Sequence, residues 1–264
     1  MLDLVMVKHL LPLLLLIGLS YSQGGSYALE FDGSNDYVTL PNSINMGTSD
    51  FTISIRFKTD DVGSGRQQVI QQTGGNANRV IAINNGGVIA SQLGSTSSES
   101  GFTASANTWY HVVLVHDDSE NTLKWYVDGT AENTNTSVNI GSNTGQFKLG
   151  TNSGSSDKWF DGQMDELRIW NDARTAAEIQ EYMHKEVASD ASGLVAYYKM
   201  SDGSGTSLAD NSSNSNTGTL TNMVTSGGSS DWVTSYAPIG DLNSSYETDV
   251  EAIWKVSGTS ASDA

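Results

Sequence analysis

The sequence predicts an all-β protein, an antiparallel β-sandwich of the jelly-roll type with one short helix. It is rich in glycine (27 residues) and poor in proline (3 residues), a composition that suits many short strands joined by turns. Two strings, FDGSNDYV at Phe31–Val38 and GQMDELRIWN at Gly162–Asn171, place carboxylates at a strand end or in a tight turn. Such a pair indicates that the first and last long strands of a sandwich lie side by side.

Alternating hydrophobicity marks the central strands. Apolar residues occupy every second position from Phe51 to Phe57, the pattern of a strand with one buried face. Trp109–His116 is almost continuously apolar, as expected at the centre of a sandwich. We expect further strands at Val80–Ile83 and Val88–Ala90 around a hairpin turn, at Leu123–Val127, Phe147–Gly150 and Trp159–Trp170, and at Leu194–Met200.

A capping box predicts the single helix. The Thr175 hydroxyl is placed to accept from the backbone N–H of Glu178, whose own side chain can reach back to the cap. Ile179, Tyr182 and Met183 then form an apolar stripe at helical spacing. We expect this helix to cover one edge or end of the sandwich and to carry no chemistry of its own.

The N-terminus has the features of a signal peptide over residues 1–22. Leu10–Leu19 is apolar but too short to span a bilayer, and small residues precede the expected cleavage before Gln23. An acidic residue near the start favours translation from Met6 over Met1. These features predict a protein that is secreted or at the cell surface. The absence of cysteine favours a bacterial over an animal origin.

The chain is strongly acidic, with a net charge of −17 and a pI near 4.3. This charge argues against nucleic acid as a partner, because binding to phosphate relies on lysine and arginine. The acidic residues are spread along the chain, so we interpret them as favouring solubility; a specific acidic interface is the alternative. After removal of the leader, the length suits one large all-β domain and a short remnant, or two small domains.

Six motifs follow one another along the chain: ALEFDGSNDYVTL, FTISIRFKT, NTWYHVVLVHD, LKWYVDGT, FDGQMDELRIWNDART and GLVAYYKMSDGSGTSLADNSSNSNTGTLTNM. In this order they resemble a known family, the laminin-G-like, concanavalin A-like jelly roll of bacterial secreted and surface proteins. The resemblance covers residues 27–240, and residues 241–264 read as a linker or the start of a further module of a multidomain protein.

The resemblance implies a structural calcium ion, for which Asp32, Asp36 and Asp165 are the candidate ligands. Calcium takes hard oxygen ligands, mainly carboxylates and carbonyls, and Asp32 and Asp36 flank a Gly-Ser-Asn turn. In a regular strand Asp165 shares a face with Leu167 and Ile169, where a cation would offset the cost of burying its charge. The alternative is a solvated or capping Asp165 at the strand's end. Glu166 and Arg168 share the other face of a regular strand, and we expect them to form a surface pair.

Carbohydrate binding is the activity that the resemblance implies most often, usually by an exposed aromatic ring that stacks on a sugar. Trp159 and Tyr37 are the candidate ligand-binding residues. Trp159 follows a polar loop, and loops often carry function. A packing role is the alternative for either ring, and Trp125, in line with Leu123 and Val127, is expected in the core.

Glucanases share this sandwich, so catalysis is the competing class. Retaining glycoside hydrolysis needs two carboxylates about 5 Å apart, but Asp165 and Glu166 are adjacent and point to opposite faces of a regular strand. His111 and His116 also fall on opposite faces, and no nucleophile elbow is present. We therefore assign no catalytic residue.

The sequence thus favours a non-catalytic secreted binding module, carbohydrate-binding or adhesive. Its expected partner is a polysaccharide, a glycoprotein glycan, or a surface or matrix protein. A glucanase-related domain and a structural spacer of a multidomain surface protein remain open, because a shared fold does not confer a shared function.

Overall fold

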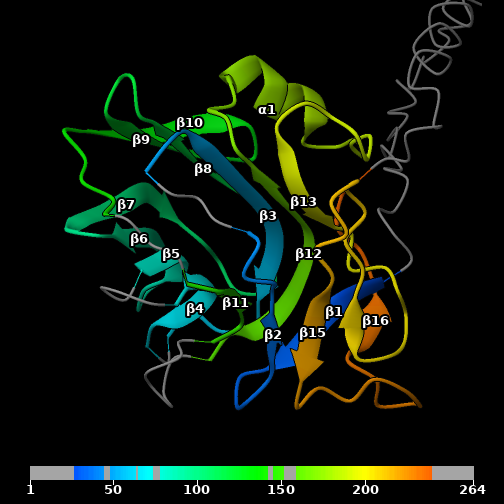
Figure 1. Ribbon diagram of the computed structural model, residues 1–264. Helices are drawn as coiled ribbons and strands as arrows, with labels where there is room; N and C mark the ends of the chain where they lie inside the picture. Colours follow the sequence, from blue (N-terminus) through cyan, green and yellow to red (C-terminus); the bar gives the residue numbers. More distant parts are fainter. Residues whose placement is uncertain are drawn as a thin grey trace, which may run out of the picture.

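The computed structural model describes residues 27–44, 48–63, 65–73, 78–141, 145–151 and 159–239. Within them, two antiparallel sheets pack face to face as a sandwich, and one helix lies on the outside (Figure 1). This arrangement confirms the predicted fold class. The expected signal peptide and the expected linker at residues 241–264 lie outside the described residues.

The first sheet, sheet A, has the strand order β10-β9-β8-β3-β12-β1-β16, and β13 pairs with β12 beside this path. Its strands are β1 (Tyr27–Asp32), β3 (Phe51–Thr59), β8 (Trp109–Asp117), β9 (Thr122–Val127), β10 (Thr130–Thr136), β12 (Asp161–Trp170), β13 (Leu194–Tyr198) and β16 (Trp232–Thr234).

The second sheet, sheet B, has the order β14-β15-β2-β11-β4-β5-β6-β7. Its strands are β2 (Tyr37–Thr39), β4 (Gln67–Gln72), β5 (Asn78–Ile83), β6 (Val88–Leu93), β7 (Thr96–Thr103), β11 (Phe147–Leu149), β14 (Ser207–Leu208) and β15 (Gly218–Thr221). We call the face of each sheet that points away from the other sheet its outer face.

The strings that predicted the fold do lie side by side. Strand β1 pairs with β12 in antiparallel register, so that Leu29 lies opposite Met164 and Asp32 opposite Asp161. After Asp32 the chain turns and enters sheet B as β2. The turn at residues 33–36 therefore joins the two sheets, and its acidic residues sit at the end of the β1–β12 ladder.

The core confirms the alternating pattern. Phe51, Ile53, Ile55 and Phe57 on β3 are all buried between the sheets. The Trp125 ring is also fully buried, as expected, and its Nε1–H donates to the Ser98 Oγ of β7 over 2.7 Å. Each such side chain contributes about 1.5–3 kcal/mol through burial alone, so these strands hold the two sheets together.

Helix α1 (Ala176–Tyr182) begins with the predicted capping box at Thr175. Its buried residue, Ile179, packs against Val113, Val115 and Tyr126, which project from the outer face of sheet A. The helix thus lies over β8 and β9 (Figure 1), so it covers a face of the sandwich more than an edge. Among the described residues, no helix is long and apolar enough to cross a membrane.

Strand β12 departs from the expected pattern at Glu166. Asp165 pairs with Arg56 and Arg168 pairs with Ser54, so two residues of β12 face the single Ile55 of β3. Glu166 adopts a positive φ of 53°, and this β-bulge interrupts the alternation of side chains. Asp165 therefore lies on the outer face with Arg56, and the prediction that it shares the face of Leu167 and Ile169 was wrong.

Candidate functional site

The outer face of sheet A carries a buried ion pair. The Arg168 guanidinium lies 2.6 Å from Glu166 Oε2, and the Tyr197 hydroxyl donates to the same oxygen over 2.5 Å. Glu166 and Arg168 thus do pair, but the prediction that they form a surface pair was wrong, because the two side chains are only 1% and 4% exposed. Arg168 also donates to the backbone carbonyls of Tyr182 and Lys185, in and after α1. The helix and the turn after it cover the pair.

Asp165 belongs to the same buried layer. Its Oδ2 accepts from the Ser235 hydroxyl over 2.5 Å, and its Oδ1 accepts from the Glu166 backbone N–H. Burial raises the pKa of Asp165 well above its usual value, and the adjacent Glu166 charge adds to this effect. Burial also lowers the pKa of Arg56 to about 10. The segment 235–239, which supplies Ser235, closes this end of the face.

The bulge places the two adjacent acids of β12, Asp165 and Glu166, on the same face of the sheet. Because of it, Asp165 and Glu166 both point to the outer face, contrary to the expectation for a regular strand. However, both acids are buried, and the cavity nearby has a volume of about 20 Å³. That volume suits one water molecule. This cavity is therefore too small for a sugar.

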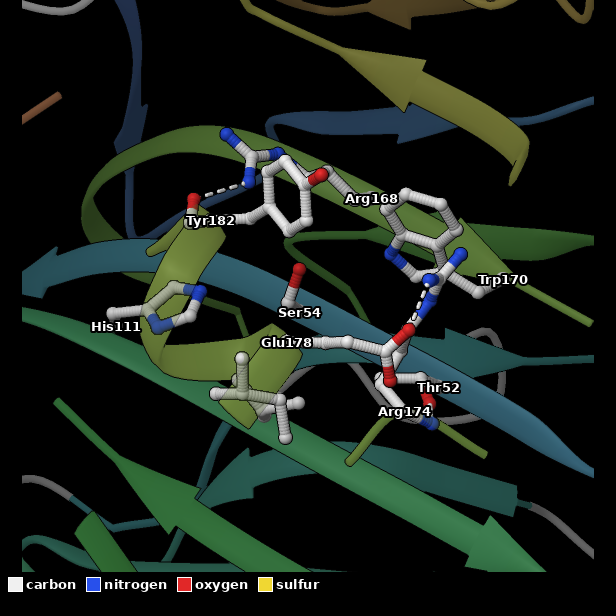
Figure 2. A pocket seen from close by; sticks show the side chains of 10 residues that line it. Thr52, Ser54, His111, Arg168, Trp170, Arg174, Glu178 and Tyr182 are labelled. Atoms are coloured by element: carbon white, nitrogen blue, oxygen red, sulfur yellow. Dashed lines mark hydrogen bonds and ion pairs between the residues drawn. The ribbon is translucent and has the colours of Figure 1, made fainter. Parts of the chain in front are cut away.

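Figure 2 shows this cavity between sheet A and α1, with the ion pair of Arg174 and Glu178 along one side. His111 lines it and is fully buried, and burial lowers the pKa of its imidazole well below the usual value. His116 lies on the opposite face of β8, stacked on the Phe51 ring at 5.3 Å. The expectation that the two histidines face apart is confirmed.

The predicted calcium ligands Asp32 and Asp36 meet in the turn between β1 and β2. Asp32 Oδ1 accepts from the backbone N–H groups of Ser34 and Asn35, and Asp36 Oδ2 accepts from the Asp32 N–H over 3.1 Å. Asp36 is 5% exposed. Burial raises its pKa to about 6, and the nearby Asp32 charge acts in the same direction.

Asp165 does not join this turn. Asp32 lies opposite Asp161, four positions earlier on β12, which corresponds to ~13 Å along the strand. Asp161 is the acid that sequence reasoning missed here, and burial and the charges of Asp60, Asp61 and Asp32 raise its pKa. Among the described residues, no three His, Asp or Glu side chains are arranged to hold a metal ion. Calcium binding stays a prediction.

The predicted aromatic residues come together on the outer face of sheet B. The Tyr37 and Trp159 rings are both half-buried, with centroids 6.4 Å apart and planes inclined by 32°. The Lys148 ammonium lies 4.6 Å from the centre of the Tyr37 ring, a cation–π arrangement. Tyr37 begins β2, and Thr39 on the same strand pairs with Lys148 on β11. Two aromatic rings and a cation thus form one accessible platform.

A polar groove of about 380 Å³ crosses the far part of the same outer face. Two alanines lie in register on its floor, since Ala82 pairs with Ala90 on the next strand, and Ala90 pairs with Glu99 on β7, which also lines the groove. The Arg66 Nε–H donates to Asn84 Oδ1 over 3.2 Å at one side. The lining comprises Arg66, Ala82, Asn84, Ala90, Gln92 and Glu99, together with three serines.

Sequence reasoning missed this groove. Its residues come from β5, β6, β7 and the segment before β4, and no local motif joins them. The one available signal was the small outward-facing residue at matching positions of the hairpin strands Val80–Ile83 and Val88–Ala90. Alanine there leaves room that a larger side chain would fill.

Comparison with solved structures finds the same fold in other proteins. The chain is similar to a proposed carbohydrate-binding protein from Bacteroides ovatus, with 22% identity, a TM-score of 0.66 and coverage of 82% of this chain and 62% of the other. The chain therefore spans less than two thirds of that protein. At this level of identity the likeness shows the fold alone.

Two weaker similarities have TM-scores of 0.48. One is to a heptameric SAP-like pentraxin from Limulus polyphemus, at 15% identity, covering 60% of this chain and 82% of the other. The other is to domain 4 of an extracellular arabinanase from Geobacillus stearothermophilus bound to arabinotriose, at 18% identity, covering 58% and 75%. No curated protein matches the chain by sequence.

The family model described as the concanavalin A-like lectin/glucanases superfamily matches residues 32–180. The match includes β2 to β12 and most of α1, which is more than half of the chain. It agrees with the two-sheet architecture and with the resemblance found in the sequence. The chain belongs to the concanavalin A-like lectin/glucanase superfamily.

Proposed function

We propose that this domain is a non-catalytic carbohydrate-binding module and that its ligand lies on the outer face of sheet B. The observation that carries the proposal is the platform formed by Tyr37, Trp159 and Lys148. A sugar ring has an apolar face that packs on aromatic rings, and its hydroxyls form hydrogen bonds with nearby polar groups. The groove beyond the platform offers such groups from arginine, amide, hydroxyl and carboxylate side chains.

Burial and size support this choice of face. The groove volume of about 380 Å³ lies within the range of small-molecule sites, whereas the cavity under α1 is too small for a sugar. The similarity to a proposed carbohydrate-binding protein is consistent with the proposal. We further propose that the partner is an extracellular polysaccharide, since the N-terminus reads as a signal peptide. An adhesive role and a structural calcium ion stay part of the same proposal.

Affinity electrophoresis and titration calorimetry test the proposal with a panel of soluble polysaccharides: arabinan, xylan, laminarin, polygalacturonate and dextran sulfate. We expect at least one to bind, and Trp159→Ala and Tyr37→Ala each to weaken that binding about tenfold or more, because truncating an aromatic anchor costs at least 1–2 kcal/mol.

Tyr236→Ala provides the matched control. Tyr236 is 66% exposed and follows Ser235, which contacts Asp165 on sheet A, so its loss should leave binding unchanged. Full binding by both platform variants would refute the assignment of the site. If the intact protein binds none of the polysaccharides, the carbohydrate proposal fails and a protein partner or a spacer role becomes the better explanation.

A further inference from the structure

The two sheets differ in the charges along their strands, on a chain whose net charge is −17. Sheet A carries more acids than bases along its strands. Among the side chains that the structure describes, the strands of sheet B carry one base, Lys148, and one acid, Glu99. Arg66, directly before β4, adds a second cation beside the groove on the outer face of sheet B.

These two cations, Arg66 and Lys148, lie where a bound ligand would meet them. Arg66 lines the groove and is positioned by Asn84. Lys148 lies over the Tyr37 ring. Lys148 pairs with Gln71 on β4, five positions after Arg66, so the two residues are ~17 Å apart along the strand direction. One cation therefore serves the platform and the other serves the groove.

Their surroundings leave these charges available to a ligand. The Arg66 contact with Asn84 uses its Nε–H and a neutral oxygen, and no carboxylate pairs with Arg66 or Lys148 among the ion pairs of the described residues. Among the described residues, most of the other basic side chains outside sheet B are paired with acids, as Lys124 is with Glu120 and Arg174 with Glu178. An anionic group would complete the arginine fork, which suits a planar carboxylate.

From this placement we propose that the ligand of the outer face of sheet B is an anionic polysaccharide, whose acidic groups pair with Arg66 and Lys148. Glu99 and Gln92 then serve the sugar hydroxyls as hydrogen-bond partners. The inference rests on the proposed carbohydrate-binding function and narrows its ligand class. The net charge of the chain repels a polyanion at long range, so the attraction must come from these local cations.

Polygalacturonate and its fully methyl-esterified form provide the test, because they share one backbone and differ in charge. We expect the intact protein to bind polygalacturonate at least tenfold more tightly than the ester. Arg66→Gln and Lys148→Gln should each weaken binding of the charged form about tenfold, the usual effect of losing a charged hydrogen bond. Because both side chains also line the proposed site, each variant should weaken binding of the ester as well, but by less than binding of polygalacturonate. Dextran sulfate against dextran forms the second arm and distinguishes sulfate esters from carboxylates.

Lys185→Gln is the matched control. Lys185 follows α1, and its side chain is 50% exposed and lies 4.0 Å from Glu181 of the helix. The variant removes the same unit of charge as the other two, so it corrects for the change in net charge. Equal effects of Arg66→Gln and Lys185→Gln, or equal binding of the charged and neutral forms, would overturn the anionic ligand class while carbohydrate binding stands. Failure of every polysaccharide to bind would refute the proposed function itself.

Discussion

On the outer face of sheet A, the charged side chains of Glu166 and Arg168 lie beneath α1 and the turn that follows it. On the outer face of sheet B, Tyr37, Trp159 and Lys148 keep accessible surface, and no helix of the described residues covers them. Both faces use cations and aromatic rings. The difference lies in what the cations meet: carboxylates and carbonyls on sheet A, and a neutral amide or a ring on sheet B.

This contrast indicates that the charged residues of sheet A stabilise the fold, whereas those of sheet B are available to bind a ligand. A buried ion pair stabilises the fold only weakly on balance, but loss of one partner is costly because the other charge stays buried. An exposed cation with no acidic partner costs little in stability and is free to meet an anion. Variants on sheet A should therefore change stability and leave binding alone, and variants on sheet B should do the reverse.

The largest expected effect is that of Glu166→Gln. It leaves the Arg168 guanidinium buried without its counter-charge, so the free energy of unfolding should fall by about 3 kcal/mol or more. Denaturant unfolding followed by tryptophan fluorescence measures this change. The folded fraction should bind polysaccharide as the intact protein does.

Glu181→Gln is the control for this variant, because Glu181 is 54% exposed and its Lys185 partner lies at 4.0 Å; its effect should stay below about 1 kcal/mol. If Glu166→Gln does not fold, Tyr197→Phe removes only the hydroxyl that donates to Glu166, at a cost of about 1 kcal/mol. Unchanged stability in both variants would contradict a structural role for this buried layer.

A medium effect is expected at Asp36, in the turn that joins the two sheets. Its pKa is raised to about 6 by burial, from an ordinary value of 3.8. A raised folded pKa gives stability that is fully present below the unfolded pKa and is lost as the pH rises through about 6. The unfolding free energy of the intact protein relative to Asp36→Asn should therefore fall by about 1–2 kcal/mol between pH 4 and pH 7.5.

Asp117→Asn should show the opposite sign, which makes it the control. The backbone N–H of Glu120 and the Ser119 hydroxyl lower the pKa of Asp117, so its contribution is present at neutral pH and is lost as the pH falls through the folded value. Unfolding curves for the three proteins measure both differences, provided that those for Asp117→Asn extend below pH 3.8, the ordinary pKa of an aspartate. A flat difference for Asp36→Asn would show that its carboxyl is solvated in the folded protein.

Much of the fold could be predicted because its signals are local or periodic. The alternation on β3, the capping box at Thr175 and the adjacency of β1 and β12 all follow from residue spacing. The face of Asp165 could not be predicted in this way. The alternation of side chains between two faces assumes a regular strand. The bulge at Glu166 depends on the tertiary packing of Glu166 with Arg168 and Tyr197, for which the local sequence contains no signal.

The candidate site likewise has parts that local sequence signals predict and parts that depend on the tertiary structure. Trp159 and Tyr37 were identified one at a time, as aromatic residues beside turns and polar loops, and the fold brings them together across more than 100 positions of sequence. The groove with Arg66 and Glu99 was not identified, because strand register alone places these residues on one surface. The net charge of the whole chain also gave no indication of the two cations, Arg66 and Lys148, on the outer face of sheet B.

The smallest expected effect concerns calcium, and it bears on the turn that joins the two sheets. If the predicted ion binds with the affinity of extracellular calcium modules, 1 mM calcium should stabilise the protein by about 0.4–1.4 kcal/mol. Thermal unfolding with calcium and with chelator measures this difference.

Two variants test which residues hold the ion. Asp36→Asn should abolish the stabilisation by calcium, since Asp32 and Asp36 meet in the turn. Asp165→Asn should leave it intact, because Asp165 is held by Ser235 on another part of β12. An unchanged midpoint in the intact protein would refute the structural ion. Loss of the calcium effect in Asp165→Asn would instead return that residue to the ligand set.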